Sequence, residues 1–488
     1  MTGTPVVDAD AEEPAERRLI WLIGGIVVGA LWIRPLTSSL WWDEFGTWWT
    51  VKDGLPQAAD RAWTYQGQSP LYYLLVWLTR HVLGHAEWAL RAPSLVCAAI
   101  SAYLLYLLVR RLVDDVCARL SVLVFVAWPI VAFSAIDTRP YALATLFTIA
   151  ATLALVRWID RGDVWLGVAT VLLVGGAAGA HYLFGLVLIP LVVYATIRVR
   201  EGSAAVRTRD FLLALIGLVI VLVPIARGFA DLWSRRSSIA LPDGLSVDWI
   251  VTLTLPGGMI GGVVLGAALA SRDGGRLSTR LRISRADLAL VVSWTAGPVL
   301  ALVVASMISP LGLQGRYSLV WAPGAVILVS LAIRAFAPAS ARRIIALTIA
   351  VLSVLALGAS DHLGDWRGAM AVIGGDATER SVVLVQSGYI ESLHLDWYAD
   401  PERVSYLGAS TSYYPVPGDA VVLPVDVSPV QDFSRDRIEG AIGDADRVFL
   451  VTSTAWMATW VGEVLHDHGF EQRQLSAGTP LAYEYVRA

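Results

Sequence analysis

Long apolar runs separated by short polar segments follow one another along most of the chain. A helix that crosses a membrane needs about 17 to 25 mainly apolar residues. Runs close to this length predict spans at 19–37, 92–112, 117–136, 140–157, 163–181, 183–198, 211–229, 250–270, 287–308, 317–335 and 343–360. The pattern therefore predicts an all-α polytopic membrane domain of about eleven transmembrane helices over residues 19–360.

A shorter apolar segment at 70–84 ends in Arg80 and His81 and can be read in two ways. If it does not cross, one large set of arginines falls together on the cytoplasmic side, where short loops are rich in arginine. The set is Arg110, Arg111, Arg119, Arg157, Arg161, Arg198, Arg200, Arg207, Arg209, Arg272, Arg276, Arg280, Arg282, Arg285, Arg334, Arg342 and Arg343. If it crosses, nearly all of them fall outside. We therefore predict an external amphipathic helix at 70–84, within a first external loop at 38–91.

The same topology orients the two ends of the chain. Arg17 and Arg18 precede an apolar run that is too long for the core of a signal peptide, so we expect an uncleaved anchor preceded by a cytoplasmic N-terminal tail at 1–18. An odd number of spans then places the C-terminal part outside the cell. The sequence predicts a multi-pass protein of the cell membrane.

Composition agrees with this class. The 488 residues are 56% hydrophobic and 16% charged, with a mean hydropathy of +0.61. These values are typical of integral membrane proteins, so we expect membrane lipids as partners and no nucleic acid. Cys97 and Cys117 lie in or beside apolar segments, which excludes a disulfide framework.

From Asp361 onward the pattern changes to short strands, turns and helices. Residues 361–488 hold eight arginines against 19 acidic residues, a net charge of −11, which leaves +7 for the rest of the chain. Buried strands are predicted at 381–386, 420–424 and 447–452, and an amphipathic helix at 456–468. We therefore predict a small, acidic, extracytoplasmic α/β domain at 361–488.

Asp43 and Glu44 stand directly after the first span, among the aromatic residues of 41–50. Carboxylates at a membrane interface are costly and are therefore functional candidates. A carboxylate in a partly dry cavity can act as a base towards a hydroxyl group. The alternative interpretation is a helix-capping pair that marks the end of the span.

Arginines begin several helices on the predicted outer side. Arg139 precedes Pro140 at the start of a span, Arg316 and Tyr317 repeat this arrangement, and Arg91 is a third case. A guanidinium beside a positive helix end binds phosphate well, because its fork pairs two oxygens. An ion pair between Asp137 and Arg139 is the structural alternative. His181 is a weaker candidate, because a lone histidine is more often a hydrogen-bonding residue than a metal ligand.

These segments together resemble the ordered motifs of the GT-C glycosyltransferases. The matching residues are Asp43-Glu44, Ser69-Pro70-Leu71-Tyr72-Tyr73, Arg91-Ala92-Pro93-Ser94, Thr138-Arg139-Pro140-Tyr141 and Gly315-Arg316-Tyr317. The chain is most similar to the bacterial protein-mannosyltransferase and aminoarabinose-transferase group, over about residues 15–360. Ser69 departs from that group, in which a proline usually stands at this position.

The resemblance implies an inverting sugar transfer from a polyprenyl-phosphate donor at the outer membrane face. The acceptor would be a cell-envelope glycan, a glycolipid or an exported protein. Asp43 would be the base and Glu44 would position the acceptor or a metal. The donor phosphate would be held by Arg139, Arg316, Arg91 and Tyr317, although Arg91 could instead support the loop. The acceptor site or the cavity wall would include Tyr72, Tyr73, His181 and Tyr182. No cofactor is implied firmly, and a divalent metal at Glu44 or His181 is left open.

Two other functions fit the same composition. A transporter or flippase of lipid-linked sugars would normally show repeated halves with polar residues near the bilayer midplane, and no repeat is visible here. In a membrane-anchored glycan-binding protein, the acidic C-terminal part would bind the glycan and the spans would serve only as an anchor. Eleven predicted spans are more than an anchor needs.

Overall fold

The computed structural model describes residues 14–234, 283–308, 315–335, 339–358, 364–443, 445–476 and 478–488. The predicted span at 250–270 and most of the tail at 1–18 lie outside the described residues. The chain forms two compact units. The membrane unit comprises Met1–Pro35, Gly67–Tyr72 and Ala92–Ala359, and the loop–sheet unit comprises Leu36–Gln66, Tyr73–Arg91 and Ser360–Ala488.

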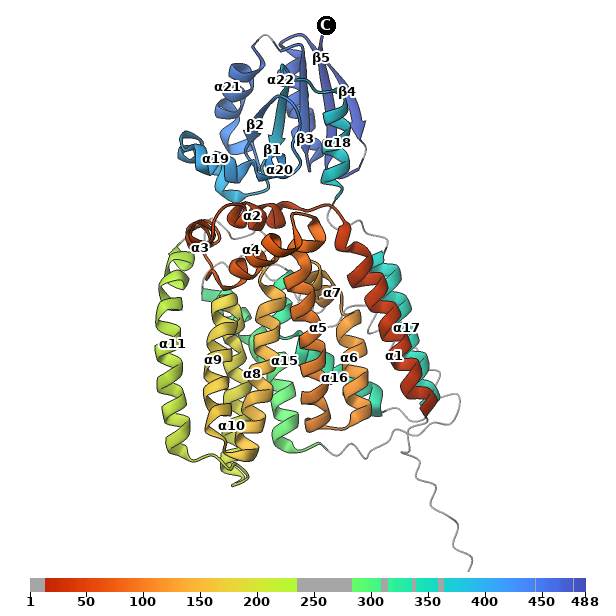
Figure 1. Ribbon diagram of the computed structural model, residues 1–488, viewed down its shortest axis with the longest axis vertical. Helices are drawn as coiled ribbons and strands as arrows, with labels where there is room; N and C mark the ends of the chain where they lie inside the picture. The colour runs from red at the N-terminus through yellow and green to blue at the C-terminus, as the bar shows by residue number, and fades with distance from the viewer. Residues whose placement is uncertain are drawn as a thin grey trace, which may run out of the picture. The chain divides into compact units, whose positions relative to one another are not determined.

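Helices that run side by side build the membrane unit (Figure 1). Their bounds are α1 (Pro14–Val28), η1 (Gly29–Ile33), η2 (Arg34–Thr37), α5 (Glu87–Leu112), α6 (Asp115–Ala127), α7 (Pro129–Ala135), α8 (Tyr141–Arg161), α9 (Val164–Ala180), η3 (Tyr182–Val187), α10 (Leu188–Arg200), α11 (Thr208–Ser234), α15 (Arg285–Ile308), η4 (Gly315–Val320), α16 (Ala322–Ala335) and α17 (Ala339–Gly358). Each apolar run predicted within the described residues coincides with one or more of these helices.

Apolar length identifies the helices that can cross a membrane. Among the described residues, six helices are long and apolar enough, or seven if the bent pair α6 and α7 counts as one span. The axes of this pair meet at 69°, and Pro129 begins α7. Proline has no N–H to donate and disfavours helical geometry in the preceding residue, so the span breaks here. The chain is thus a multi-pass membrane protein.

The loop–sheet unit begins with three helices of the segment predicted to be the first external loop. They are α2 (Trp42–Val51), α3 (Leu55–Thr64) and α4 (Leu71–Leu83), whose first two residues belong to the membrane unit. The segment expected to be an external amphipathic helix is thus helical. Its 13 residues are too few to cross a bilayer at about 1.5 Å per residue.

Residues 364–488 contribute five strands and several helices. The strands are β1 (Val382–Gln386), β2 (Asp419–Leu423), β3 (Arg447–Thr452), β4 (Phe470–Ser476) and β5 (Leu481–Arg487), and the helices are α18 (Trp366–Asp376), η5 (Ile390–Leu393), η6 (Leu395–Ala399), α19 (Pro401–Leu407), α20 (Ala409–Tyr413), η7 (Ser428–Val430), α21 (Gln431–Ile442) and α22 (Ala455–His466). The three predicted strands are present as β1, β2 and β3, and the predicted helix as α22.

The sheet has the order β2-β1-β3-β5-β4. Its first three strands are parallel, whereas β5 pairs antiparallel with both β3 and β4. Apolar residues of α21 and α22, such as Ile438 and Val461, share one buried core with Leu384 and Leu450 of the central strands. Parallel strands covered by helices explain the continuous apolar runs by which β1 and β3 were predicted.

Candidate functional site

Asp43 and Glu44 both lie in the first turn of α2, after Trp41 as its N-cap. The positive end of the helix dipole stabilises carboxylates in this turn. Their environments differ, because Glu44 is fully buried and Asp43 is half-buried. Of the two carboxylates, Asp43 is the one that solvent or a substrate can reach.

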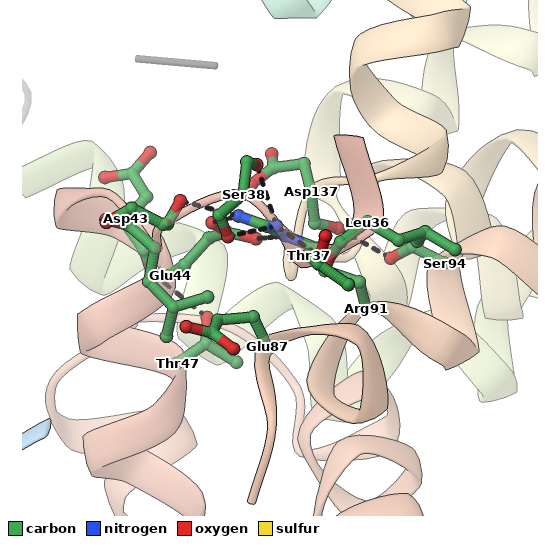
Figure 2. A network of polar contacts seen from close by, with 12 residues as sticks. Leu36, Thr37, Ser38, Asp43, Glu44, Thr47, Glu87, Arg91, Ser94 and Asp137 are labelled. Atoms are coloured by element: carbon green, nitrogen blue, oxygen red, sulfur yellow. Dashed lines mark hydrogen bonds and ion pairs between the residues drawn. The ribbon is translucent and has the colours of Figure 1, made fainter. Parts of the chain in front are cut away.

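Glu44 forms a buried ion pair with Arg91 (Figure 2). The Arg91 Nε donates to Oε1 of Glu44 at 2.8 Å, and Nη2 donates to Oε2 at 2.5 Å. The remaining donors of the guanidinium bind the loop that leads to α2, through the carbonyl oxygens of Leu36, Ser38 and Ser39. Both side chains have no exposed surface. These contacts fit the alternative in which Arg91 supports the loop. In this arrangement Glu44 is the counter-ion of Arg91.

Aromatic residues of the C-terminal segment hold α2 from a second side. Tyr389 donates its hydroxyl to the carbonyl oxygen of Trp42 at 2.6 Å, and the rings of Trp42 and Trp366 lie 4.1 Å apart between centroids. A Cβ atom on Gly46 would approach the Tyr389 hydroxyl to 3.0 Å, so this position favours glycine. The helix that carries Asp43 is therefore fixed by residues more than 300 positions away in sequence.

In the membrane unit, two distant segments converge on His181. The imidazole ring lies 5.1 Å from the ring of Tyr141 and 5.4 Å from that of Tyr317, between centroids. The guanidinium carbon of Arg316 lies 5.6 Å from the Tyr141 ring. The charges of Arg139 and Arg316 both act on His181. The structure thus brings together five residues that the sequence motifs single out.

His181 occupies the break between α9 and η3, outside both helices. Its side chain is buried, and the positive charges of Arg139 and Arg316 lie near it. Its Nδ1 atom is buried and has no hydrogen-bond partner among the described residues.

Hydrogen bonds join further motifs within the membrane unit. Tyr72 and Ser94 share a hydrogen bond of 2.7 Å between their hydroxyl groups, and Ser94 Oγ lies 2.7 Å from the carbonyl oxygen of Asp137, to which it can donate (Figure 2). The backbone N–H of Arg139 donates to the same carbonyl at 2.8 Å. These bonds fix the turn that presents Arg139 at the start of α8.

Three further predicted site residues, Tyr72, Tyr73 and Tyr182, lie in α4 or against the segment before it. Tyr72 and Tyr73 are fully buried. Tyr182 donates its hydroxyl to the carbonyl oxygen of Gly67 at 2.7 Å and packs against Phe229. These contacts order the segment before α4.

The two candidate metal ligands have environments that do not favour a cation. Both oxygens of Glu44 accept hydrogen bonds from Arg91, and His181 lies beside two positive guanidinium groups. Within the described part of the chain, no group of three or more His, Cys, Asp or Glu residues is placed to hold a metal ion.

Comparison with known proteins extends these observations. Residues 67–226 match the family profile described as dolichyl-phosphate-mannose-protein mannosyltransferase. The sequence matches no curated protein. The fold is similar to that of ArnT from Cupriavidus metallidurans bound to undecaprenyl phosphate, with a TM-score of 0.58 at 13% identity, over 96% of this chain and 98% of that chain. The apo form of the same protein gives a TM-score of 0.56 at 13% identity, over 97% of this chain and 98% of that chain.

A more distant similarity covers nearly the whole chain. The oligosaccharyltransferase of Archaeoglobus fulgidus in its apo form has a TM-score of 0.53 at 10% identity, over 99% of this chain and 75% of that chain. The fold is thus the one that ArnT and this oligosaccharyltransferase share. The profile match over residues 67–226 agrees with the resemblance to the protein-mannosyltransferase group that the ordered motifs indicate.

Proposed function

We propose that this protein is an inverting glycosyltransferase that uses a polyprenyl-phosphate sugar at the outer face of the cytoplasmic membrane. The acceptor is a hydroxyl group of a cell-envelope glycan, a glycolipid or an exported protein. The observation that carries the proposal is the convergence of Arg139 and Arg316 on His181 from segments far apart in the chain. The fold shared with ArnT, whose structure holds undecaprenyl phosphate, supports it.

The reaction breaks the bond between the anomeric carbon of the sugar and the phosphate oxygen of the donor. The acceptor oxygen attacks that carbon from the opposite side, and its proton passes to Asp43. The leaving group is a lipid monophosphate with one more negative charge on its oxygen. Fixed cations in a poorly hydrated site stabilise such a charge, and we assign this role to Arg139 and Arg316.

His181 fits this assignment as a buried neighbour of the two arginines. Its ring packs against Tyr141 and Tyr317, which follow or adjoin Arg139 and Arg316 in the sequence, and so helps to hold both segments. We expect Tyr317 to contribute to the same donor-binding surface.

The test is sugar transfer by the purified protein from a panel of polyprenyl-phosphate sugars to cell-envelope extract. The Asp43→Asn variant is compared with Asp60→Asn, an exposed carboxylate of the same loop. We expect Asp43→Asn to lower transfer by about 10²- to 10⁴-fold, the usual contribution of a general base. Asp60→Asn should transfer like the wild type.

Two further arms separate the alternatives. Transfer that stops with a chelator and returns with a divalent cation would assign a metal to the reaction. If no donor is consumed, while a labelled lipid-linked sugar crosses vesicles equally well with wild type and Asp43→Asn, the protein is a transporter and the proposal is wrong.

A further inference from the structure

A cavity of about 450 Å³ lies in the loop–sheet unit, between the end of α2 and the end of α4. Its walls include Lys52, Asp53, Arg80, His81 and His85, together with two glycines. All of these residues belong to the first external loop. The volume falls in the range of small-molecule sites, which is about 300 to 1,000 Å³.

The cavity carries an excess of positive charge. Neither Lys52 nor Arg80 forms an ion pair with any carboxylate in the described part of the chain. Asp53 is held by Arg61 at 2.7 Å, and the same arginine binds Glu402 at 3.0 Å. The lining side chains therefore sum to +1 even when both histidines are neutral.

Neighbouring contacts fix the two cations in place. Arg80 donates through Nε to Nδ1 of His85 at 3.0 Å and through Nη1 to the carbonyl oxygen of Val51 at 3.1 Å. The ammonium group of Lys52 donates to Ser405 at 3.3 Å and lies 5.5 Å from the ring centroid of Trp49. Burial lowers the pKa of both Lys52 and Arg80, because the charged forms lose contact with water. A bound anion beside them would stabilise these charged forms.

The helix that supplies Arg80 and His81 also exposes an apolar face. Leu78 and Val82 are one turn apart on α4 and are 52% and 71% exposed. Leu75, one further turn back, is half-buried. A helix with an apolar face and basic residues at its side is typical of attachment to the surface of a membrane with anionic lipids. The apolar face therefore indicates that the anion belongs to a lipid.

We propose that this cavity binds the phosphate headgroup of an anionic phospholipid, with the apolar face of α4 resting on the acyl chains of the same leaflet. The site is distinct from Asp43 and from the arginines of the membrane unit. It does not depend on the proposed sugar transfer. It ties the loop that carries Asp43 to the lipid surface.

Lys52 gives a direct probe of the site, because it is the only lysine in the sequence. The full-length protein is placed in nanodiscs of phosphatidylcholine alone or with phosphatidylglycerol. Lys52 is then labelled with a small amine-reactive reagent, and peptide mass spectrometry gives its rate relative to the N-terminal amine. We expect phosphatidylglycerol to slow the relative labelling of Lys52 by at least about fivefold, the effect of one basic residue near an anionic membrane surface.

Three variants separate a built site from general surface charge. Arg80→Gln should lose most of the protection, Arg80→Lys should keep it, and Arg380→Gln, an exposed arginine of the same unit, should behave like the wild type. Equal thermal midpoints of Arg80→Gln and wild type would show that the variant is folded. If Arg80→Gln unfolds, Leu78→Gln/Val82→Gln, which removes the exposed apolar contact with the lipid, takes its place with the same expectation.

The outcomes decide the proposal. Protection that is equal in wild type and Arg80→Gln, or no protection at all, overturns it. Protection by inorganic phosphate in phosphatidylcholine nanodiscs, without any effect of phosphatidylglycerol, overturns the lipid headgroup as the occupant. Protection by phosphatidylglycerol that depends on the charge at position 80 supports it.

Discussion

At the scale of single residues, the two adjacent acids of α2 have different parts. Both carboxylate oxygens of Glu44 accept hydrogen bonds from Arg91, and both side chains are fully buried. Taking both charges out of water is costly, and their attraction offsets that cost only while the pair is complete. Asp43 is only half-buried, and it is the residue that we propose as the base. A sequence motif of two neighbouring acids cannot distinguish these parts, because the partner Arg91 lies 47 positions further on.

The ion pair makes a prediction about stability. Arg91→Met leaves the Glu44 carboxylate buried without its counter-ion, so we expect a loss of about 3 to 5 kcal/mol. The double variant Glu44→Gln/Arg91→Met removes the lone charge and should recover part of that loss. Thermal midpoints of the detergent-solubilised protein measure both effects. A double variant that melts below Arg91→Met would show that the pair is not what holds the loop.

The donor-binding arginines make a second prediction at this scale. Arg139→Gln and Arg316→Gln each remove a fixed cation from the surroundings of His181, and we expect kcat/KM for the lipid-phosphate donor to fall by about 10²- to 10³-fold. Arg161→Gln, an exposed arginine at the far end of α8, should have no effect. Steady-state transfer with varied donor concentration gives the numbers. Equal kcat/KM values for all three variants would show that Arg139 and Arg316 do not bind the donor.

At the scale of elements, the C-terminal segment supports the helix that carries Asp43. Trp366, at the start of α18, is almost fully buried and lies edge-on to Trp42 and Phe45. Arg367 next to it donates to Glu87 at 3.0 Å and to the carbonyl oxygen of Thr37 at 2.9 Å. One helix end of the C-terminal segment thus holds both ends of the external loop.

Removing the Trp366 ring tests this support. Truncation of a buried tryptophan to alanine usually costs about 3 to 5 kcal/mol, and here the cavity opens directly beside α2. We expect Trp366→Ala to expose the segment 53–66, which contains α3, to limited proteolysis and to reduce transfer, with Trp366→Phe intermediate. Trp456→Ala, on the exposed side of α22, is the matched control. A loop that resists protease in Trp366→Ala as well as in the control would contradict the supporting role.

The elements also show how far the sequence could lead. Strands β1, β2 and β3 were predictable, because parallel strands covered by helices are apolar along most of their length. Strand β4 was missed, since the four consecutive residues from Glu471 to Gln474 are polar and exposed and give no apolar run. The packing of α2 on Trp366 and Tyr389 was also out of reach, because nothing local in either segment identifies a partner more than 300 positions away. The motif residues near His181 could be selected from the sequence because they lie at the starts of helices. Arg139 directly precedes Pro140 and α8, and Arg316 and Tyr317 lie in the first turn of η4.

At the scale of the whole molecule, the remaining question is which side of the membrane each part faces. The distribution of arginines predicts that the loop between α10 and α11, with Arg198, Arg200, Arg207 and Arg209, is cytoplasmic. It also predicts that the C-terminal domain, expected at 361–488, is outside. The proposed reaction needs this orientation, because an external acceptor must reach Asp43 in the loop–sheet unit.

Thiol labelling in intact cells tests the orientation. Both native cysteines are buried, so a single new cysteine dominates the reaction with a membrane-impermeant reagent. Ser203→Cys, in the loop after α10, should label only after the cells are permeabilised, whereas Thr459→Cys on α22 should label in intact cells. Both positions are exposed in the structure, so a difference between them reports on the membrane side rather than on burial. The reverse pattern would place Asp43 with the cytoplasmic pool of substrates and would exclude transfer at the outer face.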